Sequence, residues 1–195
     1  MRQRTERDAP PTVMRRVAAL RLDISLIDII FVTLLTKQII FIMANTYYQC
    51  YVHLVFAVKR RNCLIHASCR EKIQKYICGI VNQDRCKVIR IYCNPDHTHM
   101  LVGFRPSISI SDLVRDIKSV SSKFINEQKL MRFQFNWQDG YGVFTCSHSQ
   151  ITSVSNYIEK QPEHHKKQTF RKEYLHFLEK FEVEYDTQYL FEWIE

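Results

Sequence analysis

The sequence contains little glycine or proline, and it lacks several motifs that would assign a function immediately. Only four glycines and five prolines occur in 195 residues, which argues against a low-complexity chain. No glycine-rich run of the kind that cradles nucleotide phosphates is present, and no internal repeat is found. The hydrophobic share of 46% and the charged share of 25% are those of an ordinary globular domain.

The cysteines do not form a recognisable framework. Their number is odd, and no two have the C-x-x-C spacing of a zinc knuckle or a redox pair. Several fall where a strand or a helix would bury them, which is typical of reduced thiols that fill a core. We therefore predict a cytoplasmic protein without disulfides. The seven residues are Cys50, Cys63, Cys69, Cys78, Cys86, Cys93 and Cys146.

Acidic residues are scarce in the body of the chain and abundant at its end. The net charge is +8. Residues 43–178 carry 20 basic and 10 acidic side chains, whereas residues 179–195 carry 1 basic and 6 acidic ones. A basic body favours a polyanionic partner such as nucleic acid, although a solvated basic surface explains the charge equally well.

A long uninterrupted apolar run is also missing. Residues 26–43 are strongly apolar, but Asp28 and Lys37 interrupt them, and a spanning helix needs about 20 mostly apolar residues. The end of this stretch is a poor signal-peptide cleavage site. We predict no membrane segment, and a functional domain that spans residues 43–195. Residues 1–42 are then an extension of doubtful function, which a misplaced start would explain; an extra helix packed on the domain is the alternative.

The hydrophobic periodicity from residue 46 onward alternates between that of strands and that of helices. We expect strands over 46–58, 86–93, 97–104 and 142–146, and helices over 66–83, about 109–128, 149–161 and about 163–180. The order predicts an α+β fold: a ferredoxin-like, or RNA-recognition-like, antiparallel sheet with helices mainly on one face, plus C-terminal helices.

The strand over 97–104 has two unlike faces. Thr98, Met100, Val102 and Phe104 form its more apolar side and should meet the helices. The opposite side, which begins with His97, should then be open to a substrate.

Two short stretches carry the candidate chemistry. His97 and His99 lie two apart in a strand, so their side chains share a face and could bind one metal ion. Such a pair is more often simply solvated or hydrogen-bonded. Tyr157 and Gln161 are four apart on a helix and also share a face, which pairs a phenol nucleophile with an amide oxygen ligand. Two imidazoles and an amide oxygen would suit Mg²⁺ or Mn²⁺ acting on phosphate. The pair His164-His165 offers spare ligands or belongs to a flexible basic segment.

Another group of residues could bind nucleic acid. Arg115, Lys118, Ser122 and Lys123 line the polar side of the helix over 109–128 and could contact phosphates, or they form a solvated face. Trp137 begins an aromatic and glycine-containing segment that could stack a base or be a packed loop.

With these residues in view, the chain from residue 43 to 195 closely resembles the single-tyrosine HUH transposases of bacterial insertion sequences, the insertion sequence 200/605 group. Thr98 stands where the group usually has a bulky apolar residue between the two histidines, and residues 1–42 have no counterpart. The matching stretches are Tyr51–Ala57, Pro95–Leu101, Asp112–Lys118, Trp137–Gly142 and Tyr157–Gln161.

The resemblance implies a DNA transposase. Such proteins are homodimers that act on single-stranded DNA hairpins at the ends of their element, and the tyrosine helix of one subunit can complete the metal site of the other. By carry-over, His97, His99 and Gln161 hold Mg²⁺ or Mn²⁺, and Tyr157 is the nucleophile that forms a 5′-phosphotyrosine bond. A domesticated relative that processes repeated hairpins, a nucleic-acid-binding module without catalysis, and a metal-dependent hydrolase remain alternatives.

Overall fold

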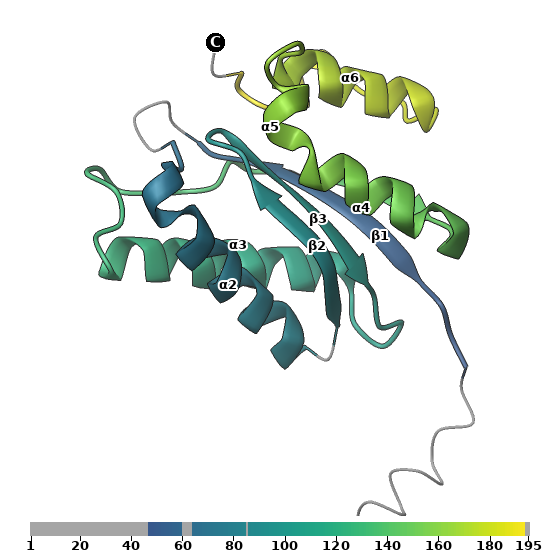
Figure 1. Ribbon diagram of the computed structural model, residues 1–195, viewed down its shortest axis with the longest axis horizontal. Helices are drawn as coiled ribbons and strands as arrows, with labels where there is room; N and C mark the ends of the chain where they lie inside the picture. The colour runs from purple at the N-terminus through teal and green to yellow at the C-terminus, as the bar shows by residue number, and fades with distance from the viewer. Residues whose placement is uncertain (1–46, 60–63, 85, 194–195) are drawn as a thin grey trace, which may run out of the picture. The chain divides into compact units, whose positions relative to one another are not determined.

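The computed structural model describes residues 47–59, 64–84 and 86–193 (Figure 1). Every helix and strand described below belongs to the compact unit Tyr48–Glu195. The predictions made for residues 1–42 lie outside the described residues, so the domain boundary at residue 43 stays a prediction. Within the described part of the chain, no helix combines the length and the apolar character that crossing a membrane requires.

Four strands form one antiparallel sheet. They are β1 (Tyr51–Ala57), β2 (Lys87–Cys93), β3 (His97–Gly103) and β4 (Gly142–Cys146). Their order across the sheet is β2-β3-β1-β4, and all three neighbouring pairs are antiparallel. This order places the two consecutive hairpin strands side by side and β1 at the centre, as in a ferredoxin-like sheet. The predicted α+β fold is therefore confirmed.

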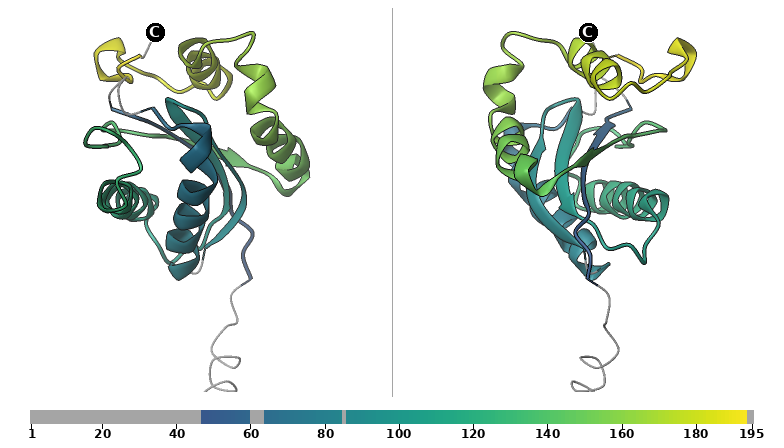
Figure 2. Two further views of the ribbon diagram at one scale, coloured as in Figure 1. Left: turned by 60° about the vertical axis from the view of Figure 1, so that its left-hand side comes forward. Right: turned by 90° about the vertical axis from the view of Figure 1, so that its right-hand side faces the viewer.

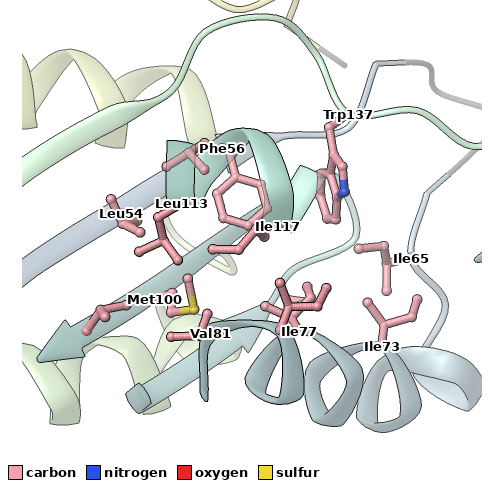
Figure 3. Packing of buried hydrophobic residues seen from close by; sticks show 14 of the residues in the cluster. Leu54, Phe56, Ile65, Ile73, Ile77, Val81, Met100, Leu113, Ile117 and Trp137 are labelled. Atoms are coloured by element: carbon pink, nitrogen blue, oxygen red, sulfur yellow. The ribbon is translucent and has the colours of Figure 1, made fainter. Parts of the chain in front are cut away.

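Two helices cover one face of the sheet, α2 (Ala67–Gln83) and α3 (Ile110–Glu127) (Figures 1 and 2). The N-terminus of α3 is capped by Ser109, whose hydroxyl oxygen accepts from the Asp112 amide. Phe56, Met100 and Ile117 are fully buried between the sheet and these helices (Figure 3). The apolar side of β3 thus faces α2 and α3, as predicted.

The C-terminal helices cover the opposite face. These are α4 (Ile151–Glu159), α5 (Gln161–His164) and α6 (Phe170–Lys180), with single 3₁₀ turns at His148–Gln150 and Thr187–Tyr189. Helix α4 packs on β2 and β3. Helix α6 packs on β1 and β4 through Phe170, Tyr174 and Leu178, which lie in a second apolar cluster with Val55 and Phe144. Figure 2 shows the two helical layers on either side of the sheet.

Two details of the sequence prediction are wrong. A single helix over 163–180 does not form: α5 ends at His164, and α6 begins only after Thr169, whose hydroxyl oxygen accepts from the Lys172 amide as an N-cap. The side of β3 that carries the histidines is not open to a substrate, because α4, α5 and α6 cover it. His97 and His99 are both fully buried.

The contact between β4 and α6 supplies a test of this arrangement. A Cβ at Gly142 would lie 2.8 Å from the Cε2 atom of Tyr174, too close to be accommodated without movement. Gly142→Ala should push α6 away from the sheet and lower the free energy of unfolding by about 1–3 kcal/mol, the usual cost of overpacking. Gly79→Ala is the matched control, since nothing lies within 4 Å of its added Cβ in the middle of α2. That change should instead stabilise by about 0.5–1 kcal/mol. Urea unfolding of both variants measures the difference, and equal effects would contradict the tight contact.

Candidate functional site

The two histidines of β3 are held by short hydrogen bonds at the hairpin that joins β2 to β3. His97 Nδ1 donates to the Asp96 carboxylate at 2.7 Å, and Asn94 Nδ2 donates to His97 Nε2 at 2.9 Å. His99 Nδ1 shares a hydrogen bond of 3.0 Å with Nε2 of His53, a buried residue of β1. These contacts direct the Nε2 atoms of both histidines toward the C-terminal helices. Sequence reasoning did not identify His53 or Asn94 as part of the site.

Tyr157 and Gln161 reach the same place from α4 and α5. The Tyr157 hydroxyl donates to Oε1 of Glu173, and the ring lies edge-on to that of His99 with 6.0 Å between centroids. Gln161 is fully buried. Its Nε2 donates to Glu173 Oε1 at 2.8 Å, and its Oε1 accepts from Asn94 Nδ2 at 2.8 Å. All four residues predicted to carry the chemistry are therefore brought together.

The centre of this arrangement is a residue that sequence reasoning missed, Glu173 of α6. Its side chain is 2% exposed, and its Oε2 lies 3.5, 3.3 and 3.1 Å from the Nε2 atoms of His97, His99 and His165. A signal was present in the sequence. Glu173 interrupts the apolar stripe of its helix, between Phe170 and Tyr174, and a charge at such a position is rarely buried unless it is paired.

The electrostatics of the site follow from one buried carboxylate among several imidazoles. Burial alone would raise the pKa of Glu173, but His99, His165 and His97 outweigh it and hold the pKa far below its ordinary value. Burial lowers the pKa of His99 to about 4, so its ring is neutral near pH 7. Burial, followed by the negative charge of Glu173, raises the pKa of the Tyr157 phenol well above 10.0. In this arrangement the phenol is a protonated hydrogen-bond donor rather than a phenolate.

The side chains at this centre have the composition of a metal site. One ligand atom from each of His97, His99, His165 and Glu173 can be chosen so that all four lie within 4.8 Å of one another. The Nε2 atom of His165 is buried and has no hydrogen-bond partner. An unpartnered buried nitrogen beside a carboxylate fits a bound cation, because both groups offer electron pairs to the same point.

Access to the site is through a cavity of about 390 Å³ between α4, α6 and β4. Tyr157 is half-buried in its wall, whereas the β3 histidines lie behind it. His53, His164 and His176 also line the cavity, together with Lys180. Its walls combine apolar, polar and imidazole side chains, and the phenol oxygen of Tyr157 is hydrogen-bonded to Glu173 there.

The residues predicted to bind DNA are not part of this centre. Helix α3 lies on the other face of the sheet, where Arg115, Lys118 and Ser122 line a separate cavity of about 490 Å³. Arg115 pairs with Asp112 and Asp116, and Lys123 lies 3.8 Å from Glu127. Lys118 Nζ donates to the Gln138 carbonyl at 2.8 Å. This surface is basic in composition but largely satisfied by its own neighbours.

Trp137 requires a correction. Its side chain is 6% exposed and packs edge-on against Phe56 and Phe135, and its indole N–H donates to the Ser121 hydroxyl at 2.8 Å (Figure 3). Trp137 lines the same cavity as Arg115, but so little of its indole is exposed that it offers no open face for a base. The packed-loop alternative therefore describes Trp137, and we do not retain it as a DNA-binding residue.

Comparison with known proteins finds one matching family and similar relatives. The family model described as "Transposase IS200 like" matches residues 46–161, more than half of the chain. The ISDra2 transposase TnpA of Deinococcus radiodurans is 27% identical over 119 residues, which cover 58% of this chain and 85% of that protein. The transposase for insertion sequence element IS200 of Salmonella typhimurium is 27% identical over 129 residues, covering 64% and 84%.

Two solved structures are similar in outline. A candidate transposase from Deinococcus radiodurans R1 has a TM-score of 0.48 and 23% identity, over 60% of this chain and 94% of that one. A REP-associated tyrosine transposase bound to a REP hairpin has a TM-score of 0.48 and 13% identity, over 62% and 72%. The span of the family match includes β1, the hairpin with both histidines, and α4 with Tyr157, and it ends at Gln161. This chain therefore belongs to the IS200-like transposase family.

Proposed function

We propose that this protein cleaves and rejoins single-stranded DNA through a covalent 5′-phosphotyrosine bond to Tyr157. The observation that carries the proposal is the convergence of Tyr157, Gln161, His97 and His99 on one centre, from three separate elements of the chain. The hydroxyl of Tyr157 lies in the wall of a cavity, while the two imidazoles stand behind it. Phosphoryl transfer needs a nucleophile that the DNA can reach, placed beside side chains that can bind a metal ion.

The reaction consists of one exchange at phosphorus and its reversal. The phenol oxygen of Tyr157 gives up its proton and forms a bond to phosphorus. The bond from phosphorus to the 3′ oxygen breaks, and that oxygen takes up one proton and leaves as a 3′-hydroxyl, so protons balance. Glu173 accepts the hydrogen bond from the phenol and fixes its direction. A Mg²⁺ or Mn²⁺ ion held by His97 and His99, near Gln161, would supply positive charge to the scissile phosphate. Because the bond energy is kept in the phosphotyrosine, a 3′-hydroxyl can reverse the exchange without a nucleotide cofactor.

The substrate and the assembly are part of the same proposal. We expect the DNA to be single-stranded hairpins at the ends of an element, because an already unpaired strand avoids the cost of opening a duplex. A homodimer, with α4 exchanged between subunits, stays a prediction. In the structure Tyr157 contacts Glu173 and His99 of its own chain.

The direct test is DNA cleavage by the purified full chain. Labelled single strands from both sides of its gene are incubated with Mn²⁺ or Mg²⁺, and the products are separated under denaturing conditions. We expect a protein–DNA adduct from one or more single strands, and none from the matched duplexes or when the metal is chelated. Binding of hairpins without any adduct would support a domesticated or binding-only protein instead. Release of free 5′-phosphate without an adduct would indicate ordinary hydrolysis.

A further inference from the structure

We propose that Glu173 and His165 are ligands of the metal centre, so that three imidazoles and one carboxylate hold a transition-metal dication. The inference rests on the proposed function for His97 and His99 as ligands, and it adds two residues that lie outside the family match, which ends at residue 161. It also assigns Gln161 the role of positioning the Glu173 carboxylate, in place of binding the metal.

The first argument is the tautomer of His165. Its Nδ1 lies 3.0 Å from the carbonyl oxygen of Gln168, and since a carbonyl only accepts, Nδ1 carries the hydrogen. In the neutral ring, Nε2 is then an electron-pair donor. It is buried, without a hydrogen-bond partner, and 3.1 Å from Glu173 Oε2. Two electron-pair donors this close are stabilised by a cation between them.

The same logic applies to His97. Its Nδ1 donates to the Asp96 carboxylate at 2.7 Å, so Nε2 is the nitrogen with the lone pair. That Nε2 lies 3.5 Å from Glu173 Oε2 and accepts from Asn94 Nδ2 at 2.9 Å. A histidine whose outer nitrogen donates to a carboxylate or a carbonyl is the usual arrangement of a metal-binding imidazole. Both His97 and His165 have this arrangement. His99 has the nitrogen of His53 in the equivalent place, at 3.0 Å.

The second argument concerns Glu173. Among the described residues, four imidazoles lie 3.1–3.5 Å from its carboxylate oxygens, those of His97, His99, His164 and His165. Three of these point at one oxygen, Oε2. The other oxygen, Oε1, accepts from Gln161 and from Tyr157. One oxygen is therefore surrounded by nitrogen ligands, whereas the other is used to hold the carboxylate and the phenol in position.

Gln161 is oriented accordingly. Its amide nitrogen, not its oxygen, faces the centre and donates to Glu173 at 2.8 Å, while its oxygen accepts from Asn94. This orientation fits a residue that holds the Glu173 carboxylate in position by hydrogen bonding. A donor set of three imidazoles and a carboxylate favours first-row transition metals over Mg²⁺, which prefers oxygen ligands.

The test is direct binding of Mn²⁺ to the metal-free full chain by titration calorimetry, with no DNA present. We expect Mn²⁺ to bind at least about ten times more tightly than Mg²⁺. Glu173→Gln and His165→Asn should each raise the Kd for Mn²⁺ by at least about tenfold, and Gln161→Ala should raise it less than Glu173→Gln does. The matched controls are Glu179→Gln on the exposed side of α6 and His148→Asn before α4, which should leave the Kd unchanged. Unchanged affinity in both Glu173→Gln and His165→Asn would overturn the inference.

A second measurement does not depend on whether the variants fold. Electron spin-echo spectroscopy of Mn²⁺ bound to the unaltered protein detects the nitrogen nuclei of coordinated imidazoles. Three coupled imidazoles are expected, and two or fewer would contradict the proposed set of three imidazole ligands.

The outcomes also separate this inference from the proposed function. Mn²⁺ binding that depends on Glu173, in a protein that forms no DNA adduct, would refute only the function. Adduct formation together with unchanged Mn²⁺ affinity in both variants would refute only the added ligands.

Discussion

Tyr157→Phe should abolish the covalent protein–DNA adduct while leaving the fold and most of the affinity for single-stranded DNA in place. Loss of a nucleophile typically costs a factor of at least about 10³ in rate, because no other group is placed to replace it. The phenyl ring should keep its edge-on contacts with His53 and Phe177, since these involve the ring and not the hydroxyl. The variant removes one hydroxyl that donates to Glu173.

The measurement is adduct formation on denaturing gels, beside DNA binding by fluorescence anisotropy. Tyr189→Phe is the control, because that tyrosine is 82% exposed and lies outside the site. The control should form adducts at the rate of the unaltered protein. An adduct that persists in Tyr157→Phe would mean that another residue is the nucleophile.

His99→Asn is the second change with a large expected effect. His99 is fully buried, and its Nε2 is 3.3 Å from Glu173 Oε2. A bound metal ion contributes several kcal/mol to phosphoryl transfer, so its loss should slow adduct formation by at least about a hundredfold. The change also removes the hydrogen bond to His53, which we expect to cost about 1–3 kcal/mol of stability because a buried partner is left unpaired.

The two effects of this change can be separated. Adduct formation is followed as Mn²⁺ is raised, at a temperature where circular dichroism shows the variant to be folded. His148→Asn, an exposed histidine before α4, should have neither effect. If folded His99→Asn forms adducts within a few-fold of the normal rate, the histidine pair is not the metal site.

The elements of the sheet could be predicted from the sequence because each has a clear period. The strand over 142–146 has the bounds that were predicted, and the helix expected over about 109–128 forms at Ile110–Glu127. The closeness of His97 and His99 could be predicted because side chains two apart in a strand must share a face. The i and i+4 spacing of Tyr157 and Gln161 likewise held their side chains close enough to meet Glu173 together, although the helix changes direction at Lys160.

What could not be predicted depends on long-range packing. Glu173 meets His97 across 76 positions of sequence, and that contact exists only because α6 folds back over the sheet. The direction of α6 depends on the non-helical segment 165–169. The hydrophobic periodicity of the sequence continues through this segment and therefore predicted a single helix. The burial of the β3 histidines follows from the same event. Trp137 was misjudged because an aromatic residue in a loop can face either solvent or the core, and local sequence does not distinguish the two.

The central claim is the covalent chemistry of Tyr157, and mass spectrometry of the DNA-linked protein tests it most directly. The adduct formed with Mn²⁺ would be digested with nuclease and protease, and the peptide that retains a nucleotide identified by its mass. The account predicts a 5′-phosphonucleotide on the peptide that contains Tyr157, attached through the phenol oxygen. A nucleotide on another residue, or cleaved DNA with free 5′-phosphate and no modified peptide, would contradict it.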